Sequence, residues 1–229
     1  MPKAAVKLNR AVARKVLATV DAGLVKGFGS PVPGQMCVEA AVNYALGHDH
    51  GDDPSCVGSA VRAFKIRLND AAWPTDKDRT EGMRRLAIAQ LGSDEIDQKE
   101  FAHYVAIETV KRLLPVTLRF SASMIPKHKD ALEGVAAGCE AVVDLLTARA
   151  AARAAREKAY EVRAAYAYAY ADAAAAAAAD AAAAYAYAYA GKSFLAERLE
   201  ILRLSAQIGL DALQHCGSKG VKWLDLCDE

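Results

Sequence analysis

The chain has 229 residues, enough for one large domain or for a domain with an appendage. Its 29 basic and 28 acidic residues leave a net charge of +1, which excludes the global positive field of a general nucleic-acid binder. Hydrophobic residues make up 53% of the chain, but many of them are alanines, which bury little apolar area. The apolar core is therefore smaller than the percentage suggests.

The pattern of apolar residues predicts neither a membrane span nor a signal peptide. No window holds about 20 strongly apolar residues, and residues 1–26 are charged throughout. The cysteines are odd in number and widely spread, which favours a reducing, cytoplasmic location. They are Cys37, Cys56, Cys139, Cys216 and Cys227.

Apolar residues recur at spacings of three and four up to residue 91, which is typical of helices with one buried face. The predicted helices are residues 3–26, 37–46, 56–68 and 76–91. Gly47 is a C-cap of the second helix, and Thr75 or Asp76 caps the fourth. Glycines and prolines in residues 27–34 end the first helix.

Further helices are predicted over residues 98–114 and 116–125, divided by Pro115, with Pro126 at the next helix start. From residue 127 to 190 the pattern stays helical, and an unbroken helix would approach about 100 Å. We therefore expect a kink or turn, with Gly134 and Gly138 as the weakest points.

Residues 164–190 consist of alanine and tyrosine with two aspartates. We predict a helix because alanine is the best helix former, although the Tyr–Ala alternation also fits a strand. After Gly191 a final helix, residues 193–216, is expected to fold back along it as a hairpin. This arm would serve self-association or act as a spacer.

The chain end, residues 221–226, alternates apolar and polar residues and is expected to be a short strand or an extended segment. The predicted fold class is all-α, with at most this one strand. The predicted division is a helical core (1–126), a long helical hairpin (127–217) and a tail that docks on the core (218–229).

Cys37 begins a predicted helix, where the helix dipole favours a thiolate. The segment from Gly34 to Ala41 resembles the nucleophile helix of papain-like and bacteriocin-processing cysteine peptidases, which implies a hydrolase. In that alternative Cys37, His50 and Asp52 are the catalytic residues. Those peptidases also place a histidine on a sheet, and none is predicted here, so the other interpretation is a buried Cys37.

The loop His48-Asp49-His50-Gly51-Asp52 suggests metal binding. It matches the HxHxD pattern of metallo-β-lactamase-like hydrolases, but the strands of that family are missing. Cys37, His48, His50 and Cys56 supply thiol and imidazole ligands of the kind that zinc prefers. The sequence predicts no cofactor, and zinc is kept as the alternative. The alternative is a polar loop that caps the following helix.

Basic side chains of the third and fourth helices predict an anion site on a face formed by residues 34–85. The candidate ligand-binding residues are Gln35, Arg62, Lys65, Arg84 and Arg85. The ligand would be a small anion of nucleotide type. The alternative is that these charges are ordinary solvated surface.

A second basic group follows spacings of four, three and seven along the long helix, which places its members on one stripe. The members are Arg149, Arg153, Arg156 and Arg163. They predict an acidic protein partner, with nucleic acid as a weaker alternative. The alternative, which the near-zero net charge favours, is that the stripe only keeps the alanine-rich helix soluble.

Residues 37–68 resemble a group of uncharacterised bacterial and phage proteins with a Met-Cys-Val-Glu-Ala-Ala start, a His-Gly-Asp loop and an Arg-x-Phe-Lys-Ile stretch. The resemblance implies no activity. The function predicted first is a non-catalytic helical binding protein that forms a homo-oligomer through its arm. The alternatives are the Cys- or metal-dependent hydrolase and a purely structural protein.

Overall fold

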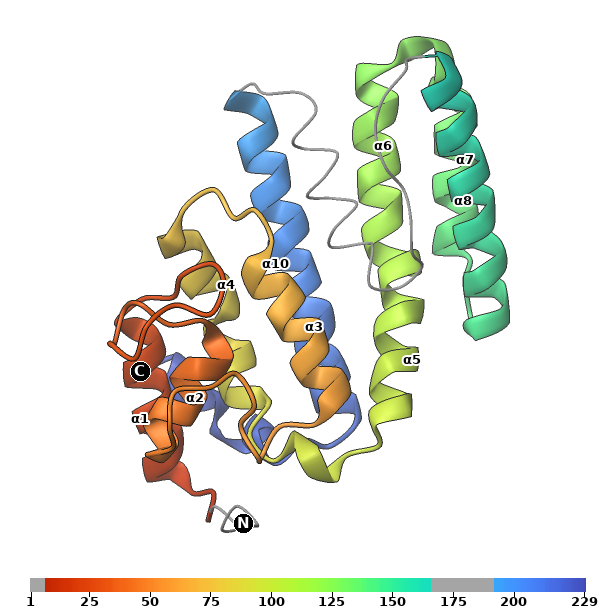
Figure 1. Cartoon of the computed structure of the whole chain (residues 1–229). Helices are drawn as coiled ribbons and strands as arrows, with labels where there is room; N and C mark the ends of the chain where they lie inside the picture. Colours follow the sequence, from red (N-terminus) through yellow and green to blue (C-terminus); the bar gives the residue numbers. More distant parts are fainter. Residues whose placement is uncertain (1–6, 166–191) are drawn as a thin grey trace. The chain divides into compact units, whose positions relative to one another are not determined.

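The computed structural model describes residues 7–165 and 192–229, which are helical without β-strands. The all-α fold class is thereby confirmed (Figure 1). The α-helices are α1 (Arg10–Asp21), α2 (Val38–Leu46), α3 (Ser59–Asp70), α4 (Asp76–Ala89), α5 (Gln98–Glu108), α6 (Leu114–Met124), α7 (Lys129–Glu140), α8 (Leu145–Ala165) and α10 (Lys192–His215). Shorter elements are η1 (Ser93–Glu95), the π-helix η2 (Thr109–Leu113), η3 (Pro126–His128) and η4 (Lys219–Cys227).

The chain forms two compact units. Unit 1 comprises Met1–Ala102 and Ala206–Glu229, and unit 2 comprises His103–Ser205. The domain limits predicted at residues 126 and 217 stay a prediction. Among the described helices, none is long and apolar enough to cross a membrane.

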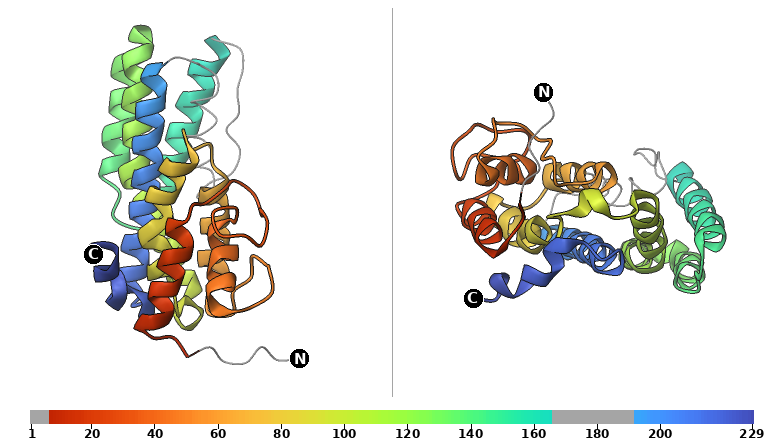
Figure 2. Two further views of the ribbon diagram at one scale, coloured as in Figure 1. Left: turned by 90° about the vertical axis from the view of Figure 1, so that its left-hand side faces the viewer. Right: turned by 90° about the horizontal axis from the view of Figure 1, so that it is seen from below.

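In unit 1, α1 packs against α2 and α4 (Figure 2). It buries Ala13, Val16 and Val20, which lie three and four residues apart and so share a face. The helix is shorter than predicted. It begins after Asn9, whose side chain accepts the N–H of Val12, and it ends before Gly23, whose φ of +123° is incompatible with a continuing helix.

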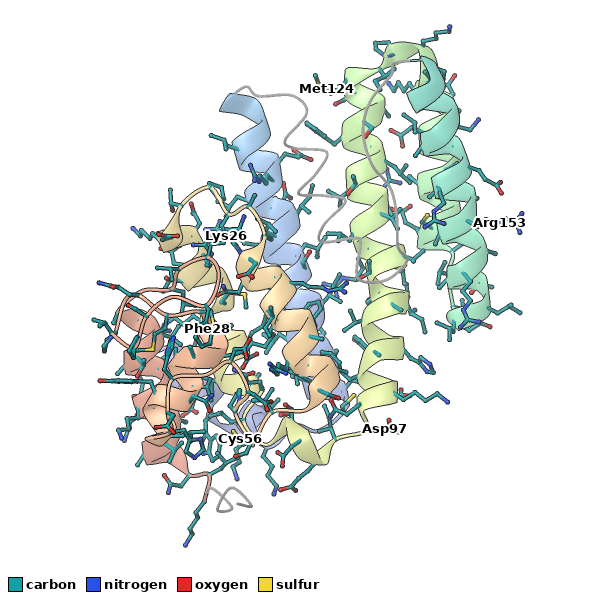
Figure 3. All side chains as sticks on the ribbon, in the orientation of Figure 1. Lys26, Phe28, Cys56, Asp97, Met124 and Arg153 are labelled. Atoms are coloured by element: carbon teal, nitrogen blue, oxygen red, sulfur yellow. The ribbon has the colours of Figure 1, made fainter. Side chains whose placement is uncertain are left out.

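The segment between α1 and α2 has no regular structure, but it is held by backbone and side-chain hydrogen bonds. Met36 forms isolated bridges with Leu24 and Gly29. Gly29 has a φ of +70°, and a side chain there would overlap the carbonyl of Gln35. Phe28, an apolar residue of this loop, is 48% exposed (Figure 3).

The caps of α2 and α4 are confirmed. Gly47 ends α2 in the left-handed conformation, and the Thr75 side chain accepts the N–H of Asp78 at the start of α4. Helix α3 begins at Ser59, later than predicted, because distant residues cap it. Gln98 Oε1 accepts the N–H of Ala60 at 3.1 Å, and Ser93 Oγ accepts the N–H of Gly58 at 3.1 Å.

The predicted C-terminal strand is wrong, because residues 219–227 form the 3₁₀-helix η4. Gly220, Trp223 and Leu226 are buried at spacings of three, the period of a 3₁₀-helix, and this face packs on α4. The alternation of apolar and polar residues over 221–226 is therefore compatible with both a strand and this 3₁₀-helix. Ser218 Oγ fixes the start of the segment by donating to the carbonyl of Ala89 at 2.6 Å.

Unit 2 contains the helices α6, α7 and α8, with α7 packed against both others. Their core is aliphatic and includes Leu118, Leu132 and Ala136. Pro115 was expected to divide a helix. It lies in the first turn of α6, directly after the π-helix η2, which accommodates the missing proline N–H.

The helix predicted from residue 127 is broken, but the predicted weak points are wrong. Gly134 and Gly138 lie inside α7, and the break falls at residues 141–144. There Asp144 Oδ1 accepts the N–H of Thr147 at 2.7 Å, and Thr147 Oγ1 accepts the N–H groups of Val143 and Asp144. This reciprocal cap starts a new helix. The Ala–Tyr tract and the hairpin closure at Gly191 lie outside the described residues.

Two glycines of the α1–α2 loop allow a matched test of this geometry. Gly27 and Gly29 have nearly the same φ, +72° and +70°, but only Gly29 faces backbone atoms that a side chain would strike. We expect Gly27→Ala to cost about 1 kcal/mol for the left-handed conformation alone. Gly29→Ala should cost at least about 2 kcal/mol more, because the loop must also move. Urea unfolding of both variants measures this, and equal losses would contradict it.

Candidate functional site

Cys37 occupies the N-cap of α2, as its place in the sequence indicates, but the residue is buried, with only 5% of its surface exposed. Its Sγ accepts the N–H of Ala40 at 3.4 Å. Burial raises the pKa of the Cys37 thiol above its usual value, so the neutral form is favoured. The backbone N–H groups at the helix N-terminus lower the pKa of this thiol, but by less than burial raises it.

The other two predicted catalytic residues are engaged elsewhere. The ring nitrogens of His50 are shielded and have no hydrogen-bond partner, and the ring packs on Phe28 with centroids 4.2 Å apart. Asp52 accepts a hydrogen bond from Arg62 at 2.7 Å. Cys37, His50 and Asp52 therefore do not form a hydrogen-bonded catalytic chain.

The predicted zinc ligands do not assemble either. In the part of the chain that the structure describes, no three His, Cys, Asp or Glu side chains form a group that could hold a metal ion. His48 Nδ1 pairs with Asn43 Oδ1 at 3.3 Å. Cys56 is 5% exposed, and burial raises the pKa of its thiol to about 11, which disfavours the thiolate that zinc needs.

The residues of the predicted anion site each contact a different partner. Gln35 is exposed and accepts a hydrogen bond from Ser30 Oγ at 2.9 Å. Arg62 binds Asp52, Arg84 binds Asp21 at 2.7 Å, and Arg85 binds Asp228 at 2.7 Å. Each guanidinium group is thus neutralised inside unit 1.

Lys65, the remaining member of that set, lies in the core together with Glu39. Both side chains have 0% exposure, and Lys65 Nζ lies 3.4 Å from Glu39 Oε1. Neither Glu39 oxygen nor the lysine nitrogen has a hydrogen-bond partner. Burial raises the pKa of Glu39 and lowers that of Lys65, while each partially offsets the shift of the other.

Glu39 was missed by the sequence analysis, although a signal was present. It stands between apolar residues in the run Met36-Cys37-Val38-Glu39-Ala40-Ala41, where a surface helix would place its charges on one face only. A lone carboxylate in such a run indicates burial with a cationic partner.

The predicted basic stripe lies on α8 of unit 2. Arg149, Arg153 and Arg156 are exposed, whereas Ala148 and Ala155 of the same helix are buried against the core. Figure 3 shows Arg153 projecting away from its helix. Its Nε donates to Glu157 at 2.9 Å, a contact exposed to solvent. The Arg163 side chain lies outside the described residues.

Two exposed aliphatic residues next to this stripe were also missed. Val143 is 80% exposed and Leu146 is 76% exposed. Val143 lies in the break between α7 and α8, and Leu146 lies in the first turn of α8, in a stretch predicted to be one continuous helix. They are the most exposed of the large hydrophobic side chains in the described part of the chain.

Comparison with known proteins gives no further guide to function, because no family model, curated protein or solved structure matches this chain. The resemblance of residues 37–68 to bacterial and phage proteins stays a prediction. Function has to be inferred from the side chains and their surroundings.

Thiol labelling tests whether Cys37, the predicted nucleophile, is shielded from reagents in the folded protein. Cys216 and Cys227 are partly exposed, while Cys37, Cys56 and Cys139 are buried. We expect an aromatic disulfide reagent to modify the first two rapidly and the other three only after unfolding, because a thiol buried in the core is out of the reagent's reach. A Cys216→Ser/Cys227→Ser variant should lose the rapid phase. Rapid modification of Cys37 in the folded variant would contradict this and restore the nucleophile hypothesis.

Replacing Lys65 by methionine tests the buried pair. The change leaves the Glu39 carboxyl without its cation, and we expect a loss of about 3–5 kcal/mol at neutral pH. Since the native pKa of Glu39 is raised, the folded state binds more protons than the unfolded state. The free energy of unfolding should therefore fall as pH rises above the ordinary value of 4.5 toward the native pKa. Urea unfolding over that range measures the slope.

The control is the double variant Glu39→Met/Lys65→Met, which removes both charges and keeps similar volumes. Its stability should be close to that of the unchanged protein or higher, with no steepened pH slope. A double variant as unstable as Lys65→Met would show that packing, rather than charge, explains the loss.

Proposed function

We propose that this chain is a non-catalytic binding protein that takes an acidic segment of a partner protein on the basic stripe of α8, formed by Arg149, Arg153 and Arg156. One observation supports the proposal most directly. All three arginines are exposed to solvent, while alanines of the same helix are buried in the core of unit 2 and hold the helix in place. The helix supplies a fixed row of cations.

Binding without catalysis is favoured over the hydrolase by the state of the candidate groups. A nucleophile needs an accessible thiolate and a base within reach. Cys37 is buried with a raised pKa, and His50 has no hydrogen-bond partner. These observations support a structural role for both residues in unit 1.

An acidic polypeptide is favoured over a small anion at residues 34–85. The ion pairs of that face are partly shielded, with the side chains of Arg62 32% and Arg84 27% exposed, whereas Arg153, paired with Glu157, is 81% exposed. From Arg149 to Arg156 the α8 stripe rises about 10 Å, at about 1.5 Å per residue, which matches an elongated partner better than one anionic group. Residues 145–165 carry five basic and two acidic side chains, a net +3, so the local charge suits an acidic partner.

Self-association through residues 164–190 and a cytoplasmic location complete the proposal. The first rests on the Ala–Tyr composition and the second on the cysteine pattern. The small anionic ligand stays a prediction without a structural observation that favours it.

Binding of a defined peptide tests the proposal. The probe is a fluorescein-labelled helical peptide with glutamates at spacings of three and four, and the readout is fluorescence anisotropy. We expect Arg149→Glu/Arg153→Glu to weaken binding at least about tenfold, and added salt to weaken binding to the unchanged protein. The matched control, Lys77→Glu/Lys99→Glu, reverses two exposed charges of unit 1. Equal affinity of both variants would overturn the proposal.

A further inference from the structure

The α7–α8 turn adds an apolar feature to the basic stripe. Leu146 lies three residues before Arg149 and seven before Arg153, so on a helix these side chains share one face. Val143 precedes them in the turn, and both aliphatic side chains are more than three-quarters exposed. Single exposed aliphatic residues are ordinary, but two of them three residues apart, at the start of a row of cations, mark a candidate binding site.

We infer that the partner segment is amphipathic: an aliphatic anchor at one end packs on Val143 and Leu146, and its acidic residues lie along Arg149, Arg153 and Arg156. This inference rests on the proposed function and names the partner that the surface fits. Apolar contact supplies affinity, and the charges fix the direction in which the segment lies.

The turn that presents the anchor site is held in one conformation. Thr147 Oγ1 accepts the N–H groups of Val143 and Asp144 at 3.2 and 3.1 Å, and it donates to Asp144. Val142, between α7 and Val143, is 2% exposed and fixes the turn to the core of unit 2. A site held in this way loses little conformational entropy when a partner binds.

The charge around the turn favours a polypeptide over a lipid surface. Asp144 follows Val143 directly and precedes Leu146 by two residues, and hydrogen bonds from Thr147 hold its pKa below the usual range, so it is ionised. A loop that inserts into an anionic bilayer would instead place cations around its apolar tip. Here the cations extend along the helix away from the tip.

The length of the surface sets the size of the partner segment. From Leu146 to Arg156 α8 rises about 15 Å, which corresponds to about three helical turns or about five extended residues. The segment is therefore short, with its anchor at the end that faces the start of α8.

Three fluorescein-labelled peptides of equal charge test the inference by anisotropy. One carries two leucines at one end of an acidic helix, one has serines in their place, and one carries the leucines in the middle. They are titrated with the unchanged protein, with Val143→Ser/Leu146→Ser and with the control Val32→Ser, which changes a residue 47% exposed in unit 1. Circular dichroism verifies that each variant is folded.

We expect the end-anchored peptide to bind the unchanged protein and the control roughly tenfold more tightly than the serine peptide. This advantage should disappear with Val143→Ser/Leu146→Ser, and the peptide with central leucines should gain less.

Equal binding of all three peptides would overturn the anchor and leave the proposed function in place. No binding of any peptide would overturn both. Anionic phosphatidylserine vesicles that bind in a Leu146-dependent manner, without a peptide preference, would overturn the inference in favour of a membrane.

Discussion

The buried side chain of Asn69 is the contact on which unit 1 depends. Its Oδ1 accepts the N–H of Val38 at the first turn of α2, and its Nδ2 donates to the carbonyl of Val25 in the α1–α2 loop. Its backbone carbonyl accepts Arg79 Nε from α4 at 2.8 Å. One residue near the end of α3 thus positions two helices and a loop that has no regular structure of its own. Because Asn69 has no exposure, each group left unpaired would cost about 1–3 kcal/mol.

The buried pair of Glu39 and Lys65 affects how α2 and α3 align more than it affects stability. Two desolvated charges add little stability relative to apolar side chains of the same size, since the cost of removing them from water is comparable to their attraction. A packing of α2 on α3 that separated them would leave one buried charge alone. The pair therefore disfavours other alignments of the two helices more than it stabilises this one. The buried Cys37 and Cys56 keep the surroundings of the pair apolar.

Local signals were sufficient for much of the fold. Gly47 and Thr75 end and begin helices by rules that depend on a few neighbouring residues, and these limits were correctly predicted. The start of α3 was not, because its cap comes from Gln98, a residue far along the chain. The predicted strand at the tail was wrong because residues 221–226 alternate apolar and polar, while Trp223 and Leu226, three residues apart, share a face on a 3₁₀-helix but not on a strand. Contacts between distant residues also explain why the zinc and anion hypotheses could not be judged from the sequence. A sequence shows which side chains are near each other along the chain, but not which carboxylate neutralises which cation.

The candidate binding surface on α8 also has a part that the sequence predicts and a part that it does not. Its arginines could be predicted from the helical period, which needs no tertiary information. Its apolar end could not, because a continuous helix gives Val143 and Leu146 no reason to differ from the buried residues beside them. The Asp144–Thr147 cap breaks the helix between Val142, which stays in the core, and Leu146, which is exposed. One four-residue motif therefore ends the α7 segment and begins the row of arginines. It also leaves two aliphatic side chains in solvent at the point where that row starts, so the fold of unit 2 and its candidate binding surface have the same local cause.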